Sequence, residues 1–527
     1  MMSDKADGLL VRYPRHIAFL RGQNQKMRLR LVFGAGVSMP IDFPGWGELV
    51  GRIATKLNAN NLIEGEVSDA SLTAKVQYLY EYFIQNQSET TTFDDNRFKH
   101  EETRARWNAI LSECLYRDTK RVETHPYLGK MSHLIQRSKF LVNYNFDDSV
   151  EKLISSLVPD DARGGKKPFE TIWSLNTRLK EDVMTIYHPN GFIPSHRHDY
   201  ASDRIVFSDE TFSNQIIGEQ PGSHSFVHHF LQNTCLLFGI SLDDVTLRQH
   251  LRRLALMAPG LNHVLVAHFD SIRPYSAEQQ AAISAANFEV YNLLTMFLTT
   301  EDIGIFCELL MEDDLEFYER AARLGVQVKF TYYITGGVAA GKTTSMQHFG
   351  SCNTYDEWVE SSPEVVSKPY TNLTADQKRE ADHWIGRQFG LKNRALRDCR
   401  EGIHIVDRAP LDPLSFETSS IKERAAQLEN SFRPGASNHK VEEGQIVLLQ
   451  CPNHELKRRL ISKNKFWNED IIAKNVGALW DLYNSGSYGV DSYASGANVT
   501  AKNISRLIFL HPYCPSDLDK ALVGKLA

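Results

Sequence analysis

The chain has 527 residues, of which 42% are hydrophobic and 24% charged, and its formal net charge at pH 7 is −6. This composition is that of folded globular domains, and the small negative charge excludes a general attraction to nucleic acid or to an anionic membrane. The seven cysteines include no CxxC pair, and no apolar run is long enough to cross a bilayer. We therefore expect a cytoplasmic protein with reduced thiols, no signal peptide and roughly two to four domains.

The first pattern along the chain with chemical content is a glycine-rich turn after an apolar strand. Residues 1–30 are polar, with a short helix expected around residues 16–21 and its basic side chains on a solvated face. A strand then starts at Leu31, and after the turn an amphipathic helix is expected over Trp46–Asn58. Small side chains leave backbone amides open to a bound phosphate, although an ordinary turn between a strand and a helix has the same pattern. The candidate phosphate-binding residues are Gly34, Ala35, Gly36 and Ser38.

Three later strands each end in polar residues. Residues 70–115 first give a helical pattern, which predicts a helical layer inserted over the turn. The strand from Phe140 leads into Asn145-Phe146-Asp147, and the strand from Met184 leads into His188-Pro189-Asn190-Gly191. Open α/β sheets bind ligands at the carboxyl ends of their strands, so these side chains are site candidates. The third strand, from Cys235, closes on the candidates Gly239, Ser241 and Asp244.

The remainder of the first half predicts more strands and then helices. Strands are expected over His263–Phe269 and around Phe288–Tyr291, and helices over Glu301–Leu310 and Asp314–Leu324. The acidic residues 312–316 mark the expected domain boundary.

In this order, the GAGVS turn, the NFD loop, the histidine near a glycine and the GxSLxD loop resemble the sirtuin-like fold over about residues 25–310. Within that fold they resemble the bacterial defence branch more closely than the protein deacylases. The resemblance implies that NAD is the substrate. It places Gly34, Gly36 and Ser38 at the dinucleotide phosphates, Asn145 and Asp147 beside the nicotinamide ribose, and Gly239 and Ser241 on the adenosine side.

Two features depart from that family. The zinc ribbon of the deacylases is absent, because no cysteine lies between Cys114 and Cys235, so no zinc is expected. The family's catalytic histidine directly precedes its glycine, whereas here Asn190 holds that position and His188 is displaced.

Cleavage of the bond between nicotinamide and ribose passes through an oxocarbenium-like centre, which needs polar groups that orient water and hold ribose hydroxyls. Asn145 can hold a water or a hydroxyl without titrating, and His188 can accept a proton near neutral pH. The alternatives are that Asn145 only caps the next helix and that His188 only closes a turn. The predicted catalytic residues are Asn145, His188 and Asp147.

A second domain opens with a strand over Val326–Ile334, whose alternate apolar side chains share one face. It runs directly into Gly336-Gly-Val-Ala-Ala-Gly-Lys-Thr343, the GxxxxGK[ST] pattern in its strand, loop and helix context. In such a loop the amides cradle phosphates, the lysine reaches the terminal phosphates and the threonine hydroxyl can ligate Mg²⁺. The candidate nucleotide-binding residues are Gly336, Gly341, Lys342, Thr343 and Thr344, with Thr343 also a metal ligand.

Three motifs follow the P-loop: an acidic pair before Trp358, a strand that ends in Asp407-Arg408, and a basic helix after the strand Gln445–Gln450. With the P-loop, they resemble the deoxynucleoside and thymidylate kinase group over about residues 326–515. The resemblance assigns Asp407 to Mg²⁺ or the acceptor, Arg408 to the phosphates, Arg458 and Arg459 to the lid, and either Glu357 or Asp356 to the acceptor hydroxyl. The basic helix has a plain alternative, a solvated face.

We therefore predict an α/β chain with a sirtuin-like Rossmann-type domain and helical insertion over residues 1–312, followed by a P-loop kinase-like domain over residues 326–527. The function favoured is an anti-phage NAD⁺ hydrolase, controlled by a domain that senses or phosphorylates a nucleotide and uses ATP or another nucleotide with Mg²⁺. A metabolic deoxynucleoside or nucleotide kinase with a regulatory NAD module is the alternative, and an NAD-dependent deacylase is third. Expected partners are NAD, a nucleoside or nucleotide made during phage infection, and further copies of the chain, but no membrane.

Overall fold

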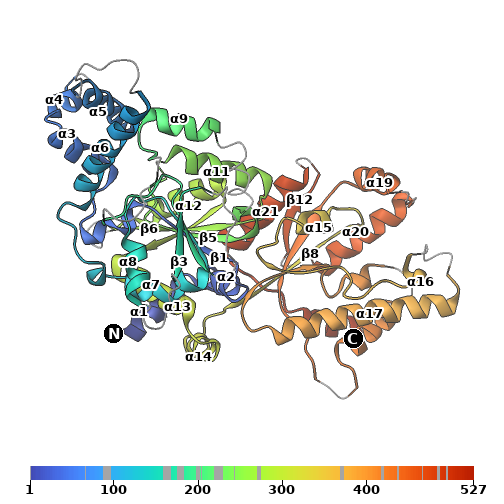
Figure 1. Cartoon of the computed structure of the whole chain (residues 1–527). Helices are drawn as coiled ribbons and strands as arrows, with labels where there is room; N and C mark the ends of the chain where they lie inside the picture. The colour runs from blue at the N-terminus through green and yellow to red at the C-terminus, as the bar shows by residue number, and fades with distance from the viewer. Residues whose placement is uncertain are drawn as a thin grey trace. The chain divides into compact units, whose positions relative to one another are not determined.

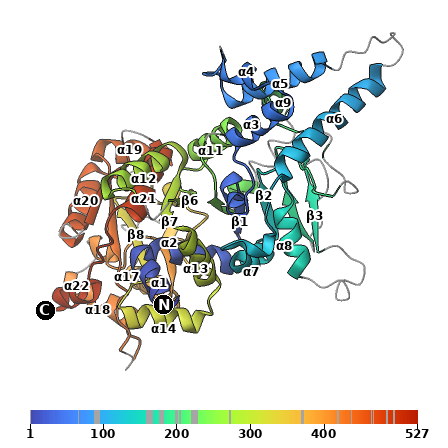
Figure 2. The ribbon, with the colours of Figure 1, turned by 90° about the vertical axis from the view of Figure 1, so that its left-hand side faces the viewer.

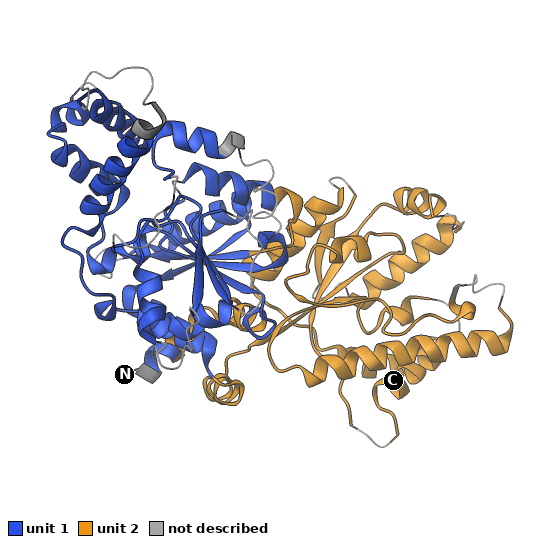
Figure 3. Cartoon of the chain, in the orientation of Figure 1, with its two compact units in different colours: residues 1–6, 23–254, 263–312 blue, residues 7–22, 255–262, 313–527 orange. Residues whose placement is uncertain are grey.

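The computed structural model describes residues 2–65, 67–86, 96–157, 168–174, 183–196, 202, 205–218, 229–242, 244–269, 274–367, 373–416, 420–435, 438–463, 465, 467–483, 487–493 and 496–527. The chain forms two compact units, each built on a parallel β-sheet with helices around it (Figures 1 and 3). Unit 1 contains residues 1–6, 23–254 and 263–312, and unit 2 contains residues 7–22, 255–262 and 313–527. Across the described ranges, no helix combines the length and the apolar character that a bilayer crossing requires.

The sheet of unit 1 has seven strands in the order β3-β4-β2-β1-β5-β6-β7, and every neighbouring pair is parallel. The strands are β1 (Leu29–Phe33), β2 (Phe140–Asn143), β3 (Phe169–Ile172), β4 (Met184–Tyr187), β5 (Thr234–Phe238), β6 (His263–His268) and β7 (Leu293–Leu298). Most are continuous apolar runs, because helices cover both faces of such a sheet. Since β4, β2, β1 and β5 are consecutive neighbours, the loops at their carboxyl ends meet along one edge.

The helices of unit 1 include one at a place where a strand was expected. They are α3 (Trp46–Lys56), α4 (Asn60–Glu64), α5 (Leu72–Asn86), α6 (Asn96–Tyr116), α7 (Leu128–Ser138), α8 (Ser149–Leu157), α9 (Asp209–Gly218), α11 (Val245–Met257), α12 (Ala277–Tyr291) and α13 (Thr300–Met311). The strand expected around Phe288–Tyr291 is wrong, because these residues end α12. A capping box between Ser276 and Gln279 starts that helix, and Asn292 in the left-handed conformation ends it, so the buried strand begins at Leu293.

The helical pattern predicted over residues 70–115 falls on α5 and α6, which form one helical layer with α3 and α4 beside the sheet of unit 1 (Figure 2). Its core includes Leu49 and Ile53 of α3, Leu79 of α5 and Leu111 of α6. Phe146, the middle residue of the NFD loop, is also part of this core. The loop at the end of β2 is therefore held by the helical layer.

The sheet of unit 2 has five parallel strands in the order β12-β11-β8-β10-β9. They are β8 (Lys329–Gly336), β9 (Asn353–Tyr355), β10 (Gly402–Asp407), β11 (Gln445–Gln450) and β12 (Ser487–Asp491). Because β8 is central, nearly all of it is buried on both faces, and both Tyr332 and Tyr333 are buried. The P-loop thus leaves the middle of the sheet.

The helices of unit 2 come from both ends of the chain. They include α1 (Met2–Arg12, from residue 7), α2 (Pro14–Gln25, to residue 22), α14 (Asp314–Leu324), α15 (Lys342–Met346), α16 (Glu364–Ser367), α17 (Ala375–Asp398), α18 (Ile421–Phe432), α19 (Asn453–Ile461), α20 (Glu469–Tyr483), α21 (Gly496–Leu510) and α22 (Leu518–Leu526). The expectation that the first basic residues are all solvated is wrong for Arg21, which is 2% exposed. Its guanidinium pairs with Glu401 (Nε to Oε2, 3.0 Å) and Asp314 (Nη2 to Oδ1, 2.8 Å).

Candidate functional site

The glycines after β1 and β5 pack against each other. Gly34 N donates to Phe238 O (3.0 Å), and Gly36 N donates to Gly239 O (3.1 Å). A Cβ at Gly34 would lie 2.6 Å from Gly239 O, and one at Gly239, which has φ +63°, would lie 2.5 Å from Val37 N. These distances leave no room for a side chain, so close packing of the two loops is itself sufficient reason for glycine at these positions.

Asn145 ties the NFD loop to the glycine-rich turn. Its Nδ2 donates to Gly34 O (3.0 Å) and to Ser38 Oγ (3.1 Å), and the Ser38 hydroxyl donates to Asp147 Oδ2 (2.8 Å). Four candidate residues from two loops therefore form one buried network. Both hydrogen bonds of the Asn145 amide use its nitrogen, so its Oδ1 is the acceptor of this network that a ligand or a water can use.

Asp147 also begins the following helix. Its Oδ1 accepts from Ser149 N (3.0 Å), and burial raises the pKa of its carboxyl, against hydrogen bonds from Ser149 and Ser38 that lower it. The next residue, Asp148, accepts from the Tyr116 hydroxyl (3.0 Å) and from Ser195 N (2.9 Å). Sequence reasoning missed Tyr116 and Asp148, although Asp148 stands directly beside a predicted site residue.

His188 is completely buried, and both of its ring nitrogens are engaged. Nδ1 lies 2.7 Å from Asn145 O, and Nε2 lies 2.9 Å from Glu151 Oε1. Burial lowers the pKa of the imidazole, but the Glu151 carboxylate and the two hydrogen bonds outweigh this, and the net pKa is raised. Glu151, on α8, was not predicted, and no motif in the sequence marks it.

Asn190 and Asp244 form a second contact at this edge of the sheet. Asn190 Nδ2 lies 3.4 Å from Asp244 Oδ2, while the buried Asn190 Oδ1 has no partner within the described part of the chain. Asp244 Oδ1 accepts from Leu247 N (2.8 Å) at the start of α11, and burial raises the pKa of this carboxyl. Ser241 is exposed.

His125 forms a hydrogen bond to Val37 in the glycine-rich turn, and the sequence analysis did not predict this role. Its Nδ1 accepts from Leu128 N (3.0 Å), so Nε2 carries the hydrogen and donates to Val37 O (2.6 Å). Burial lowers the pKa of this histidine, which favours its neutral form. Nothing in the local sequence signals the role, because the contact spans 88 residues.

The P-loop of unit 2 has its lysine folded back onto its own backbone. Lys342 Nζ donates to Gly336 O (2.9 Å) and Gly337 O (3.1 Å), and burial lowers its pKa to about 8, with Arg408 acting in the same direction. Gly336 and Gly341 have φ of +144° and +100°, so glycine is required at both turns.

Oxygen ligands suitable for Mg²⁺ lie beside this loop. Thr343 Oγ1 donates to Asp407 Oδ2 (2.7 Å), and the buried Asp407 Oδ1 has no partner among the described residues. Burial raises the pKa of Asp407 and outweighs Lys342 and the hydrogen bond from Thr343, which lower it. A hydroxyl and a carboxylate are the hard donors that Mg²⁺ takes together with phosphate oxygens, so these residues fit that ion. In the described ranges no group of three or more His, Cys, Asp or Glu side chains could hold a metal alone.

Arg408 and Glu357 form an ion pair at the end of β10. Arg408 Nε donates to Glu357 Oε1 (2.6 Å). Burial raises the pKa of Glu357, but Arg408 lowers it more, and the net shift is downward. Asp356 is exposed, so of the two candidates for the acceptor hydroxyl the geometry turns Glu357 toward the site. Lys392 of α17, which was not predicted, donates to the backbone oxygens of Asp407 (2.7 Å) and Glu357 (3.2 Å).

The two predicted lid arginines differ. Arg459 Nη1 lies 3.4 Å from Ala340 O in the P-loop, and its Nη2 donates to Ser492 O (2.9 Å). Arg458 is 73% exposed and pairs with Glu455. Thr344 is exposed beside the loop.

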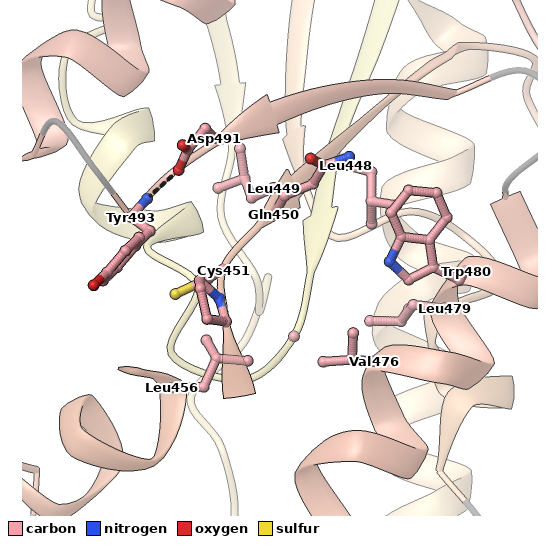
Figure 4. Close-up of a pocket in the computed structure, with 12 residues that line it drawn as sticks. Leu448, Leu449, Gln450, Cys451, Leu456, Val476, Leu479, Trp480, Asp491 and Tyr493 are labelled. Carbon is pink, nitrogen blue, oxygen red and sulfur yellow. Dashed lines mark hydrogen bonds between the residues drawn. The ribbon is translucent and has the colours of Figure 1, made fainter. Parts of the chain in front are cut away.

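A cavity of about 310 Å³ adjoins the P-loop at Gly337 (Figure 4). Leu449 from β11 and Trp480 from α20 form apolar walls, and Tyr493 beyond β12 lies on the opposite side from Trp480. Asp491 Oδ1 holds Tyr493 by accepting from its backbone N (2.7 Å). The cavity offers aromatic surface close to the phosphate loop.

Residues 139–291 match the family described as "SIR2-like domain". This stretch includes Asn145, Asp147, Glu151, His188 and Asn190. The chain therefore contains a SIR2-like domain on a parallel α/β sheet, and the predicted fold class is confirmed. No curated protein sequence matches the chain.

Two solved structures are similar to this chain at low sequence identity and with low TM-scores. Deoxyadenosine kinase from M. mycoides is 14% identical, with 33% of this chain and 96% of that chain covered and a TM-score of 0.27. A gluconokinase from Sinorhizobium meliloti 1021 is 15% identical, with 38% of this chain and 99% of that chain covered and a TM-score of 0.23. Because these TM-scores are low, any nucleotide-binding role of unit 2 must be argued from its own residues.

Proposed function

We propose that unit 1 cleaves NAD⁺ and releases nicotinamide, and that unit 2 binds a nucleotide that controls this cleavage. The observation that carries the first part is the Asn145 network inside the SIR2-like stretch. Two hydrogen bonds fix the amide nitrogen of Asn145, and its amide oxygen stays available as an acceptor. A fixed acceptor of this kind orients a water or a ribose hydroxyl while positive charge develops on the sugar.

The cleavage needs a polar, pre-organised edge more than it needs a strong base, because the departing nicotinamide leaves an electrophilic sugar. Asn190 Oδ1 is a buried acceptor without a partner in the described ranges, and both hydrogen bonds of the Asn145 amide use its nitrogen, which leaves Oδ1 as an acceptor. Asp147 holds Ser38 and so keeps the Asn145 amide in position. Gly34, Ala35 and Gly36 lie next to this network, where the NAD phosphates would bind.

For unit 2 we propose ATP or a related nucleotide with Mg²⁺. The P-loop would hold the phosphates, with Lys342 exchanging its two backbone acceptors for phosphate oxygens. Mg²⁺ would neutralise phosphate charge, held by Thr343 and Asp407. The cavity between Trp480 and Tyr493 would take the base.

A defence role is proposed from the combination of the two units. Uncontrolled NAD loss would harm the cell that makes the protein, so the cleavage needs a switch, and a nucleotide made during phage infection would supply one. A ligand acts as a switch only through different affinities for the resting and active states. We propose that the resting and active states also differ in self-association.

A second candidate function is supported by the Arg408–Glu357 pair. A half-buried carboxylate held by an arginine beside the P-loop can accept a hydroxyl proton during phosphoryl transfer. On this alternative, unit 2 is a metabolic nucleoside or nucleotide kinase and unit 1 only binds NAD. A deacylase remains third, since the chain lacks the cysteines of a zinc ribbon between Cys114 and Cys235.

The variant Asn145→Ala tests the NAD cleavage. It removes the free acceptor and should abolish nicotinamide release, measured by chromatography of NAD and its products after incubation with nucleotides. Asn86→Ala, at an exposed position of α5 in the same unit, is the matched control and should behave as the native chain. Undiminished hydrolysis by folded Asn145→Ala would remove this residue from the mechanism.

The variant Lys342→Ala separates the two candidate functions. It removes the charge that meets the terminal phosphates, so nucleotide binding should fall sharply. If unit 2 is the sensor, NAD loss in infected cells should stop although Asn145 is untouched. If unit 2 is an independent kinase, phosphorylation of nucleosides should stop and NAD chemistry should continue. Unaltered NAD depletion would exclude the sensor function.

A further inference from the structure

Glu151 and His188 form a buried pair directly behind Asn145. Glu151 lies on α8 and His188 follows β4, and 37 residues of chain separate them. Glu151 Oε1 lies 2.9 Å from His188 Nε2 and also accepts from Thr171 Oγ1 (3.1 Å). On the other side of the ring, His188 Nδ1 lies 2.7 Å from the backbone oxygen of Asn145. The imidazole therefore connects a helix to the loop that carries Asn145.

The hydrogen positions on this ring follow from its partners. A backbone oxygen only accepts, so Nδ1 must carry a hydrogen and donate it to Asn145 O. The remaining proton lies between Nε2 and Glu151 Oε1. Either His188 is a cation beside a carboxylate, or both groups are neutral and the Glu151 hydroxyl donates to Nε2. In both states the pair has no net charge.

This arrangement leaves His188 without a lone pair for a substrate. Its one basic nitrogen points at Glu151, and its side chain is completely buried. A general base must reach the proton that it removes, either directly or through one water. The acceptors that remain at this edge are the amide oxygens of Asn145 and Asn190.

We propose that Glu151 is a positioning residue that acts through His188 on the backbone of Asn145, and that His188 does not serve as the base. This inference rests on the proposed NAD cleavage for its kinetic test only. The pair holds the carbonyl of Asn145 in place, which sets the direction of the Asn145 side chain. Orientation of the attacking water is then left to amide groups.

The test uses conservative variants of both residues in the full chain. In His188→Asn, the new Nδ2 can stand where Nδ1 stood and still donate to Asn145 O. This variant should retain more of the kcat for nicotinamide release than His188→Ala, which should lose at least about tenfold, because a buried carbonyl loses its donor. Equal loss in the two folded variants would overturn the inference and return His188 to the role of base.

Glu151 offers the matched comparison. Glu151→Gln can hold Nε2 through its amide and should keep most of the activity, whereas Glu151→Leu leaves that nitrogen unpaired and should lower kcat about tenfold with little change in KM. Loss of activity in Glu151→Gln as large as in Glu151→Leu would show that the carboxylate itself takes part in proton transfer, and would overturn the positioning role.

A readout that is independent of NAD cleavage separates this inference from the proposed function. Hydrogen exchange of peptides over residues 140–149 should accelerate in Glu151→Leu and stay near native in Glu151→Gln. If no preparation releases nicotinamide but exchange follows this order, the proposed function fails and the positioning pair stands. If exchange is unchanged in Glu151→Leu, the positioning pair fails, whatever the activity.

Discussion

A series of glycine-to-alanine substitutions in unit 1 separates two reasons for glycine in the turn. Gly51 in α3 has nothing within 4 Å of an added Cβ, so alanine should stabilise the helix by about 0.5–1 kcal/mol. At Gly36 the new Cβ would lie 2.8 Å from Gly239 Cα, and overpacking of this kind costs about 1–3 kcal/mol. At Gly239 the contact of 2.5 Å is joined by φ of +63°, which adds about 1–2 kcal/mol for an L-residue.

The free energy of unfolding should therefore rise for Gly51→Ala and fall for the other two, most for Gly239→Ala. Urea denaturation with hydrogen exchange of peptides from β1 and β5 measures this in unit 1 separately from unit 2. If the glycines served only to admit NAD phosphates, Gly239→Ala would lower NAD affinity and leave the unfolding midpoint unchanged. A midpoint equal to that of the native chain would refute the packing argument.

Three further outcomes are expected. Arg21→Met leaves the buried Glu401 carboxylate without its partner and should destabilise unit 2 by about 3–5 kcal/mol in denaturant unfolding, whereas a cost below about 1 kcal/mol would mean that water reaches the pair. Because the pKa of Lys342 is lowered to about 8, the fraction of unliganded chain with a charged Lys342 falls as pH rises through this value. The affinity for ATP, measured by calorimetry, should therefore be weaker at pH 9.5 than at pH 7. An affinity that does not change with pH would contradict this. Arg459→Ala should weaken ATP binding severalfold and the exposed control Arg458→Ala should not, and equal effects would place both residues in the lid.

Local patterns predicted the elements well where one signal dominated. The helix expected over Asp314–Leu324 is confirmed at both ends, because an aspartate caps its start and Gly325 takes the left-handed conformation at its end. The strand expected around Phe288–Tyr291 is wrong, because apolar residues at the end of a helix and at the start of a strand cannot be told apart by composition.

The candidate site was predictable only in its loops. Motifs pointed to Asn145 and Ser38, which the structure brings within hydrogen-bonding distance, and their roles stay predictions. Glu151 and His125 could not be found, because their contacts depend on which strands are neighbours, and periodicity does not encode sheet order. Burial of Arg21 escaped detection for the same reason: a lone arginine in a polar segment has the pattern of a surface residue.

Unit 2 is assembled from three separate stretches of chain, which the ribosome synthesises at different times. Arg21 is synthesised 293 residues before Asp314 and 380 residues before Glu401. At a synthesis rate of about 5–20 residues per second, Glu401 is made on the order of 20–80 s after Arg21. Phe19 of the same helix packs edge-to-face against Phe509, with ring centroids 5.2 Å apart, so this contact also forms only after residue 509 has been made. The buried arginine of α2 therefore reaches its final surroundings only after the stretch that contains Asp314 and Glu401 has been made.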